Sequence, residues 1–186
     1  NNWLYAGVVP ANPWRSAMTL PRELELVKVD GRYVLASKVV REIENIASEW
    51  ETITDGSLGS HDAYQLRLTV DMTKENTWRL SNGKNEYLEF YVNPGARMIV
   101  ARRNGSTGAS SFSASFSLPA LRMPVEGNED SIELDIFVDR SSVEFFTADG
   151  TSAMTMIVFP ENIYDKIECA SGEIDGKVRS LARIWK

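Results

Sequence analysis

The chain has 186 residues, enough for one well-buried domain with a short appendage. Its net charge of −6 argues against a nucleic-acid partner, because phosphate binding needs clustered positive charge. No apolar run approaches the roughly 20 residues of a membrane-spanning helix, and the single cysteine, Cys169, excludes an internal disulfide.

A hairpin is the first element that the sequence predicts. Leu24–Val29 and Tyr33–Val40 are rich in residues that favour strands, and Asp30-Gly31 lies between them. An Asp-Gly pair favours the tight turns that join antiparallel strands, since these turns need positive φ angles. The sequence therefore predicts two paired strands with Asp30-Gly31 at the tip.

Two further stretches allow more than one local structure. Val40–Trp50 has apolar residues at helical spacing but lacks a clear cap, so a short helix and an irregular strand are both open. Gly105–Ser117 is rich in Ser and Gly, yet Phe112 and Phe116 alternate with smaller residues. This second stretch is interpreted as a loop that leads into a polar strand.

Two long strands with alternating apolar residues dominate the rest of the chain. Their apolar residues are Tyr64, Leu66, Leu68, Val70 and Met72, and then Ile132, Leu134, Ile136 and Val138. Successive side chains of a strand point to opposite faces, so each strand is expected to have one buried and one solvated face. The predicted fold is all-β: a two-sheet antiparallel β-sandwich, concanavalin- or lectin-like, with a short N-terminal arm.

Charged residues cluster at two places. Arg97, Arg102 and Arg103 stand beside an Asn-Gly pair, which predicts the solvated end of a hairpin. Six acidic residues lie between Glu126 and Asp139, and a calcium site or a catalytic pair there would need a ligand order that the sequence lacks. The favoured interpretation is a solvated strand face, and no metal site is predicted.

The segment Asp139-Arg140-Ser141-Ser142 combines residue types that occur in catalytic clusters. A serine-hydrolase triad lacks support, because the only histidine, His61, lies in another loop and no G-x-S-x-G motif is present. The segment instead predicts a tight turn. In such a turn Asp139 and Ser141 bond to backbone amides and Arg140 pairs with a carboxylate.

Two separated segments carry a family resemblance. The first is W-x-Y-A at residues 3–6, followed by P-x-x-P-W-R-x-x-M-T-L-P-R-E-L-x-L at residues 10–26. The second is F-V-D-R-S-S-V-E-F-F at residues 137–146, followed by D-G and F-P. They resemble the end of the five-bladed propeller and the following β-sandwich of family 32 glycoside hydrolases, which include levanases, inulinases and invertases. The resemblance implies that residues 1–26 are the terminal segment of a propeller catalytic domain and residues 27–186 are the C-terminal β-sandwich.

The resemblance also implies where the catalytic carboxylates of such a retaining β-fructosidase lie. They belong to W-M-N-D-P-N-type, R-D-P and E-C segments, all upstream of the W-x-Y-A segment. This sequence contains no D-P-N and no R-D-P, and its Glu168-Cys169 follows the sandwich segment. Glu168 is therefore interpreted as an ordinary strand residue. No catalytic residue and no cofactor are predicted, and whether the chain is itself an enzyme stays open.

Three N-terminal residues are the candidates for contact with sugar. The resemblance implies that Trp3, and with it Asn2 and Tyr5, match the part of the last blade that lines the fructose pocket. Indole and phenol rings suit such a place because they stack on the C–H faces of sugars. The other interpretation is that Trp3 fills the seam between blade and sandwich.

The leading interpretation of function is a non-catalytic C-terminal β-sandwich of an enzyme that cleaves β-fructosidic bonds in fructans or sucrose. Its expected partners are the propeller domain, fructan or sucrose in the intact enzyme, and, as an option, further copies in a homo-oligomer. No nucleic acid and no membrane span are expected. An extracellular or cell-envelope location is favoured, and a cytoplasmic one stays open.

A carbohydrate-binding module is the alternative function. Sandwich folds can bind glycans on exposed aromatic side chains, and a fold alone does not decide function. Trp50, Trp78 and Tyr87 are the candidates because each stands among polar neighbours. Two coplanar exposed rings would favour this alternative, and burial of the rings would weigh against it.

Overall fold

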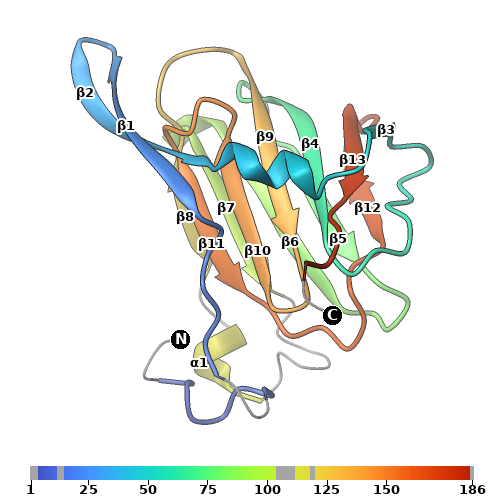
Figure 1. Cartoon of the computed structure of the whole chain (residues 1–186). Coiled ribbons are helices and arrows are strands. Elements are labelled where there is room, and N and C mark those ends of the chain that lie inside the picture. The colour runs from blue at the N-terminus through green and yellow to red at the C-terminus, as the bar shows by residue number, and fades with distance from the viewer. Residues whose placement is uncertain (1–3, 12–14, 104–111, 118–119, 185–186) are drawn as a thin grey trace.

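The protein is a nearly all-β sandwich in which two antiparallel sheets face each other (Figure 1). The computed structural model describes residues 4–11, 15–103, 112–117 and 120–184. In spatial order, one sheet holds β11 (Ala153–Ile157), β10 (Ser142–Thr147), β9 (Ser131–Val138), β4 (Tyr64–Asp71), β13 (Gly176–Ser180) and β3 (Glu51–Thr52). The other holds β12 (Lys166–Cys169), β5 (Thr77–Ser81), β6 (Tyr87–Asn93), β7 (Met98–Arg103) and β8 (Leu121–Pro124). The predicted fold class is confirmed.

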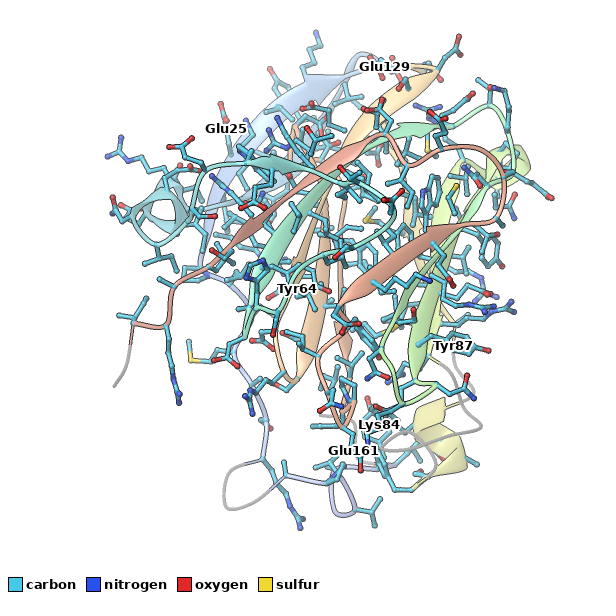
Figure 2. The ribbon with its side chains drawn as sticks, turned by 90° about the vertical axis from the view of Figure 1, so that its right-hand side faces the viewer. Glu25, Tyr64, Lys84, Tyr87, Glu129 and Glu161 are labelled. Atoms are coloured by element: carbon cyan, nitrogen blue, oxygen red, sulfur yellow. The ribbon has the colours of Figure 1, made fainter. Side chains whose placement is uncertain are left out.

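The core lies between the two sheets and uses alternate residues of their strands. All of the apolar residues predicted on the first long strand are buried, and Tyr64 satisfies its hydroxyl by donating to the carbonyl oxygen of Tyr164 at 2.8 Å. Figure 2 shows Tyr64 in the middle of the molecule, far from the outward-pointing Tyr87. Phe90 of the five-stranded sheet meets Phe145 of the six-stranded sheet with ring centroids 5.4 Å apart. Aromatic packing therefore joins the two sheets across the core.

The predicted hairpin forms a separate two-stranded sheet, here called the ribbon, of β1 (Arg22–Val29) and β2 (Arg32–Val39). Asp30 and Gly31 at its tip both have positive φ, 47° and 84°, as the sequence requires. The ribbon projects beyond the sandwich at the upper left of Figure 1. The predicted domain division after residue 26 falls inside β1 and stays a prediction.

A short helix lies across the outside of the six-stranded sheet (Figure 1). It is the 3-10 helix η1 (Arg41–Asn45), and it decides the open question about the stretch 40–50 in favour of a helix. Asn93 caps a second such turn, η2 (Pro94–Ala96), by accepting a hydrogen bond from the Ala96 amide. Among the described residues, no helix has the length and apolar character to cross a membrane.

The Ser-rich stretch differs from its prediction. Where a polar strand was expected, Ala114–Ser117 form a single helical turn, α1. Phe116 in this turn is buried and packs on Phe112 and Phe159 at centroid distances of 4.7 and 5.7 Å. The two phenylalanines that suggested a strand therefore lie in and next to one short helical turn, where they pack on each other. Residues 105–111 of the stretch lie outside the described residues.

Candidate functional site

The residues predicted to contact sugar lie at the N-terminal arm. Asn2 and Trp3 are outside the described residues. Tyr5 is half-buried, and its ring meets Phe116 of α1 edge-on, with centroids 5.1 Å apart and planes at 82°. Tyr5 is thus in contact with the end of the sandwich, and its role toward sugar stays a prediction.

Arg103 lies at the same end of the sandwich and corrects one prediction. Instead of standing in solvent, its side chain is buried, and its guanidinium lies 3.9 Å from the centroid of the Phe116 ring. Burial lowers the pKa of Arg103, because removing a cation from water disfavours its charged form. Only Arg102 of the two neighbouring arginines keeps an exposed side chain.

Glu168 is a strand residue, as predicted; it lies on β12 and is exposed. Its carboxylate accepts a hydrogen bond from Lys166 at 2.8 Å, and this bond lowers the pKa of Glu168. A general acid of a glycosidase needs the opposite shift, because it must hold a proton near neutral pH. The surroundings of Glu168 therefore do not prepare it for that role.

The predicted turn at residues 139–142 is confirmed. The Asp139 Oδ1 atom accepts hydrogen bonds from the backbone amides of Ser141 and Ser142 at 2.7 and 2.9 Å. Arg140 pairs with Asp62 at 2.8 Å on the surface. The residues that resembled a catalytic cluster are engaged in holding the turn between β9 and β10.

The acidic stretch 126–139 is only partly solvated. Glu133 is exposed as predicted, but Asp135 is buried on the outer face of the six-stranded sheet. Arg67 donates to both Asp135 oxygens at 2.7 and 2.9 Å, and Gln65 donates to one of them at 3.0 Å. Within the described ranges, no group of three or more His, Cys, Asp or Glu side chains could hold a metal ion.

This outer face of the six-stranded sheet, here called the covered face, carries a connected polar network. Arg179 is buried, donates to Gln65 at 2.8 Å and makes two 2.6 Å hydrogen bonds with Glu44 of η1. Trp50 closes the network from outside, with the Arg179 and Arg67 guanidinium carbons 4.3 and 5.3 Å from its ring. The network thus attaches η1 and Trp50 to the sheet.

The two segments that carry the family resemblance meet on this face. Glu144, from the second segment, is buried, with 2% of its surface exposed. Its carboxylate accepts hydrogen bonds from the Leu20 amide at 2.8 Å and from Arg22 at 2.7 Å, both in the first segment. Thr155 of β11 donates to the same carboxylate at 3.1 Å. A buried charge therefore fixes the place where the N-terminal segment crosses the sandwich.

The ribbon has one packed face and one bare face. Val27, Val34 and Ala36 share the packed face, which lies over the loop before β11, where Ser37 donates to the Gly150 carbonyl at 2.7 Å. On the other face the register places four large apolar residues together, each between 56% and 73% exposed. They are Leu24, Leu26, Tyr33 and Leu35.

The outer face of the five-stranded sheet, here called the open face, is polar; Arg102 and Glu168 are exposed on it, whereas Glu89 is buried, with 7% of its surface exposed. The register aligns four charged residues of alternating sign across β12, β5, β6 and β7. This row, here called the ladder, consists of Glu168, Arg79, Glu89 and Arg102. Burial works to raise the pKa of Glu89, but hydrogen bonds from Arg102 and Arg79 outweigh it and hold the pKa below its ordinary value.

The three aromatic candidates for glycan binding do not form one platform. Trp78 is buried and stacks on Phe90 at 5.5 Å, Trp50 lies on the covered face, and Tyr87 is on the open face. Trp78 was misjudged because its polar neighbours along the strand, Thr77 and Arg79, point to the opposite side.

The family model described as "Glycosyl hydrolases family 32 C terminal" matches residues 35–186. The chain belongs to this family. The match begins inside β2 and includes all strands of both sheets, whereas the arm and β1 precede it. The resemblance inferred from the two segments is thereby confirmed.

The chain is also similar to several complete enzymes. It is 30% identical over 206 residues to a levanase of Bacillus subtilis. This alignment covers 100% of this chain and 30% of the levanase. It is 28% identical over 178 residues to an extracellular exo-inulinase of Aspergillus niger, with coverage of 87% and 33%. A crystal structure of exo-inulinase from Aspergillus awamori shares the fold with a TM-score of 0.82 at 24% identity, covering 100% of this chain and 40% of that chain. The chain spans about a third of the length of the curated relatives it matches.

Proposed function

We propose that this chain is the non-catalytic C-terminal domain of an enzyme that hydrolyses β-fructosidic bonds in fructans or sucrose. In this proposal its role is to support the catalytic domain that precedes it in the polypeptide. Family membership and the names of the relatives, levanase and exo-inulinase, support the substrate class.

The observation that carries the proposal is the position of the exposed apolar side chains. Eight large hydrophobic residues are exposed among the described residues, and seven of them lie between Leu4 and Leu35, before or at the start of the family match. Four of the seven form the bare face of the ribbon. A contiguous apolar face of this kind marks an interaction site in soluble proteins.

The fixed arm adds a second argument. Glu144 holds Leu20 and Arg22 on the sandwich, so the N-terminal segment is attached to it at a fixed point. A preceding domain would then meet the arm and the bare face of the ribbon together. This sequence contains neither the D-P-N nor the R-D-P segment in which the resemblance places catalytic carboxylates. This favours a structural role for the chain over a catalytic one.

The test replaces the segment of the Bacillus subtilis levanase that aligns with this chain by the chain itself. The chimera is expected to release fructose from levan, whereas the 186-residue chain alone releases none. Replacing Leu24 and Leu26 by serine in the chimera should lower its melting temperature and its activity. The matched control replaces Glu23 and Glu25 by serine. These residues lie on the same strand but on its opposite face, so the melting temperature and the activity should not change.

Two outcomes would contradict the proposal. Fructose release by the chain alone, surviving repurification, would show that it is catalytic. A chimera that keeps its full stability and activity after the Leu24 and Leu26 replacements would show that the bare face does not contact the catalytic domain. In that case, dimerisation of the chain that disappears with the same replacements would assign the face to a homo-oligomer.

A further inference from the structure

The open face contains a groove that the proposed supporting role does not use. The groove has a volume of about 1000 Å³, and the ladder lies along its floor. The loops around Asp55 and at Gly172–Ile174 form its wall beside β12. A concave surface bounded by loops on one side of a sheet is a common place for ligands.

The charges of the groove are mixed and nearly balanced. Its lining holds three cations and four carboxylates. The cations are Arg79, Arg102 and Lys166, and the carboxylates are Asp55, Glu89, Glu168 and Glu173. A strongly charged polymer of either sign would meet repulsion at half of these groups, so the groove suits a neutral ligand.

The ladder alternates hydrogen-bond donors and acceptors at a regular interval. Guanidinium groups only donate and ionised carboxylates only accept, and neighbouring strands lie about 4.8 Å apart. A hydroxyl group both donates and accepts, so a chain rich in hydroxyl groups can accept from Arg79 and Arg102 and donate to Glu168, while the buried Glu89 holds the two arginines in place. Four strands give the row a length of about 14 Å, which calls for an oligosaccharide and not a single sugar.

The donors are held in place before any ligand binds. Arg102 donates from Nε to Glu89 at 2.8 Å, and Arg79 donates to the other Glu89 oxygen at 3.1 Å. The Arg79 guanidinium lies 4.2 Å from the centroid of the Tyr87 ring, and that of Arg102 lies 5.9 Å from Tyr91. Both tyrosines stand on β6, one on each side of the ladder. Side chains fixed in this way lose little entropy on binding.

We infer that the groove over the ladder binds a neutral, hydroxyl-rich oligosaccharide, with Arg79, Arg102 and Glu168 as its principal polar contacts. The groove and its chemistry are independent of how the ribbon is covered. The choice of fructans as the first ligands rests on the proposed function.

The experiment titrates the full chain with levan- and inulin-type oligosaccharides and with neutral dextran and xylan oligosaccharides in a calorimeter. Saturable binding to at least one of them is expected. Arg102→Ala should weaken it at least about tenfold, because charge-assisted hydrogen bonds are lost. Glu168→Gln, at an exposed end of the ladder, should weaken it about threefold. Thermal melts check that each variant is folded.

Arg140→Ala is the matched control, because it also removes an exposed arginine paired with one carboxylate but lies outside the groove. It should leave the affinity unchanged. The inference is overturned if no neutral glycan binds saturably, or if Arg102→Ala and Arg140→Ala have equal effects. An anionic polysaccharide is titrated in parallel, and binding confined to it and abolished by salt would also overturn the inference. Binding to dextran or xylan but not to fructans would support the groove while speaking against a fructan as its ligand.

Discussion

The outer faces of the two sheets carry the same types of charged residue but differ in what covers them. On the covered face, Glu144 and Arg179 are buried beneath the arm and η1. On the open face Glu89 is also buried, but its partners Arg79 and Arg102 keep 43% and 58% of their side chains exposed. Both faces therefore hold a buried carboxylate, but its arginine partner is largely covered on one sheet, where Arg22 is 23% exposed, and exposed on the other.

This difference predicts how much each face contributes to the stability of the fold. Buried ion pairs cost much when one partner is lost, whereas exposed pairs contribute little to stability. The covered face should therefore matter for folding and for the path of the arm. The exposed arginines of the open face can change at a smaller cost.

The largest expected effect is on the covered face. Arg22→Ala leaves the carboxylate of Glu144 buried without its cation, and the free energy of unfolding should fall by about 3 kcal/mol. Urea denaturation followed by tryptophan fluorescence measures it. Arg32→Ala, which removes an exposed partner of Glu126, is the control and should stay within about 0.5 kcal/mol. Equal losses in both variants would refute the contrast between buried and exposed pairs.

A matched pair of arginines compares the two faces directly. Arg179→Ala leaves Gln65 without its donor and frees Glu44, so a loss of about 2 kcal/mol is expected. Arg102→Ala leaves the buried Glu89 with Arg79 as its remaining partner, so a smaller loss of about 1 kcal/mol is expected. Urea denaturation of both variants compares their losses in the free energy of unfolding. A larger loss for Arg102→Ala would reverse the assignment of the two faces.

Acid should lower the stability that ion pairs contribute on both faces, by less than the substitutions above. The pKa values of Glu44 and Glu89 lie below the ordinary 4.5 in the folded chain. The unfolded chain therefore takes up protons first, and the stability from these pairs, present above pH 4.5, is lost as the pH falls through the folded pKa values. Melting temperatures between pH 7 and pH 3 should fall less steeply for Glu44→Gln and Glu89→Gln than for the wild type. Curves parallel to the wild type would contradict this prediction.

The ribbon should show the smallest effect on stability. Leu26→Ser with Leu35→Ser changes side chains that are 69% and 56% exposed, so the free energy of unfolding should change by no more than about 0.5 kcal/mol. Self-association, measured by sedimentation velocity, should decrease in the same variant, because the bare apolar face is removed. A loss of stability above 1 kcal/mol would mean that this face is already packed within the chain.

Short-range patterns in the sequence predicted much of the fold. The alternation from Tyr64 to Met72 and the Asp30-Gly31 pair depend on strand geometry and turn angles, which are local, so both predictions were confirmed. The turn at Asp139 was predicted for the same reason. The family resemblance came from two segments, and the structure shows that they touch through Glu144 and Arg22.

The failed prediction for Asp135 depends on distant parts of the chain. Asp135 alternates with apolar residues as a solvated residue would, and its burial follows from Arg67 and Gln65 on a neighbouring strand and from Trp50 and η1 above them. Trp78 was misjudged for a local reason: Thr77 and Arg79 lie on the opposite side of its strand, so its own side chain points into the core.

The sequence by itself determined the two long strands, the turns at Asp30-Gly31 and Asp139, and the family to which the chain belongs. Only the tertiary structure decided which face of each sheet is covered, because alternation distinguishes two faces of a strand without saying what lies over the outer one. The same holds for the ladder: Glu168, Arg79, Glu89 and Arg102 are scattered over 90 residues of sequence, and strand register alone makes them neighbours.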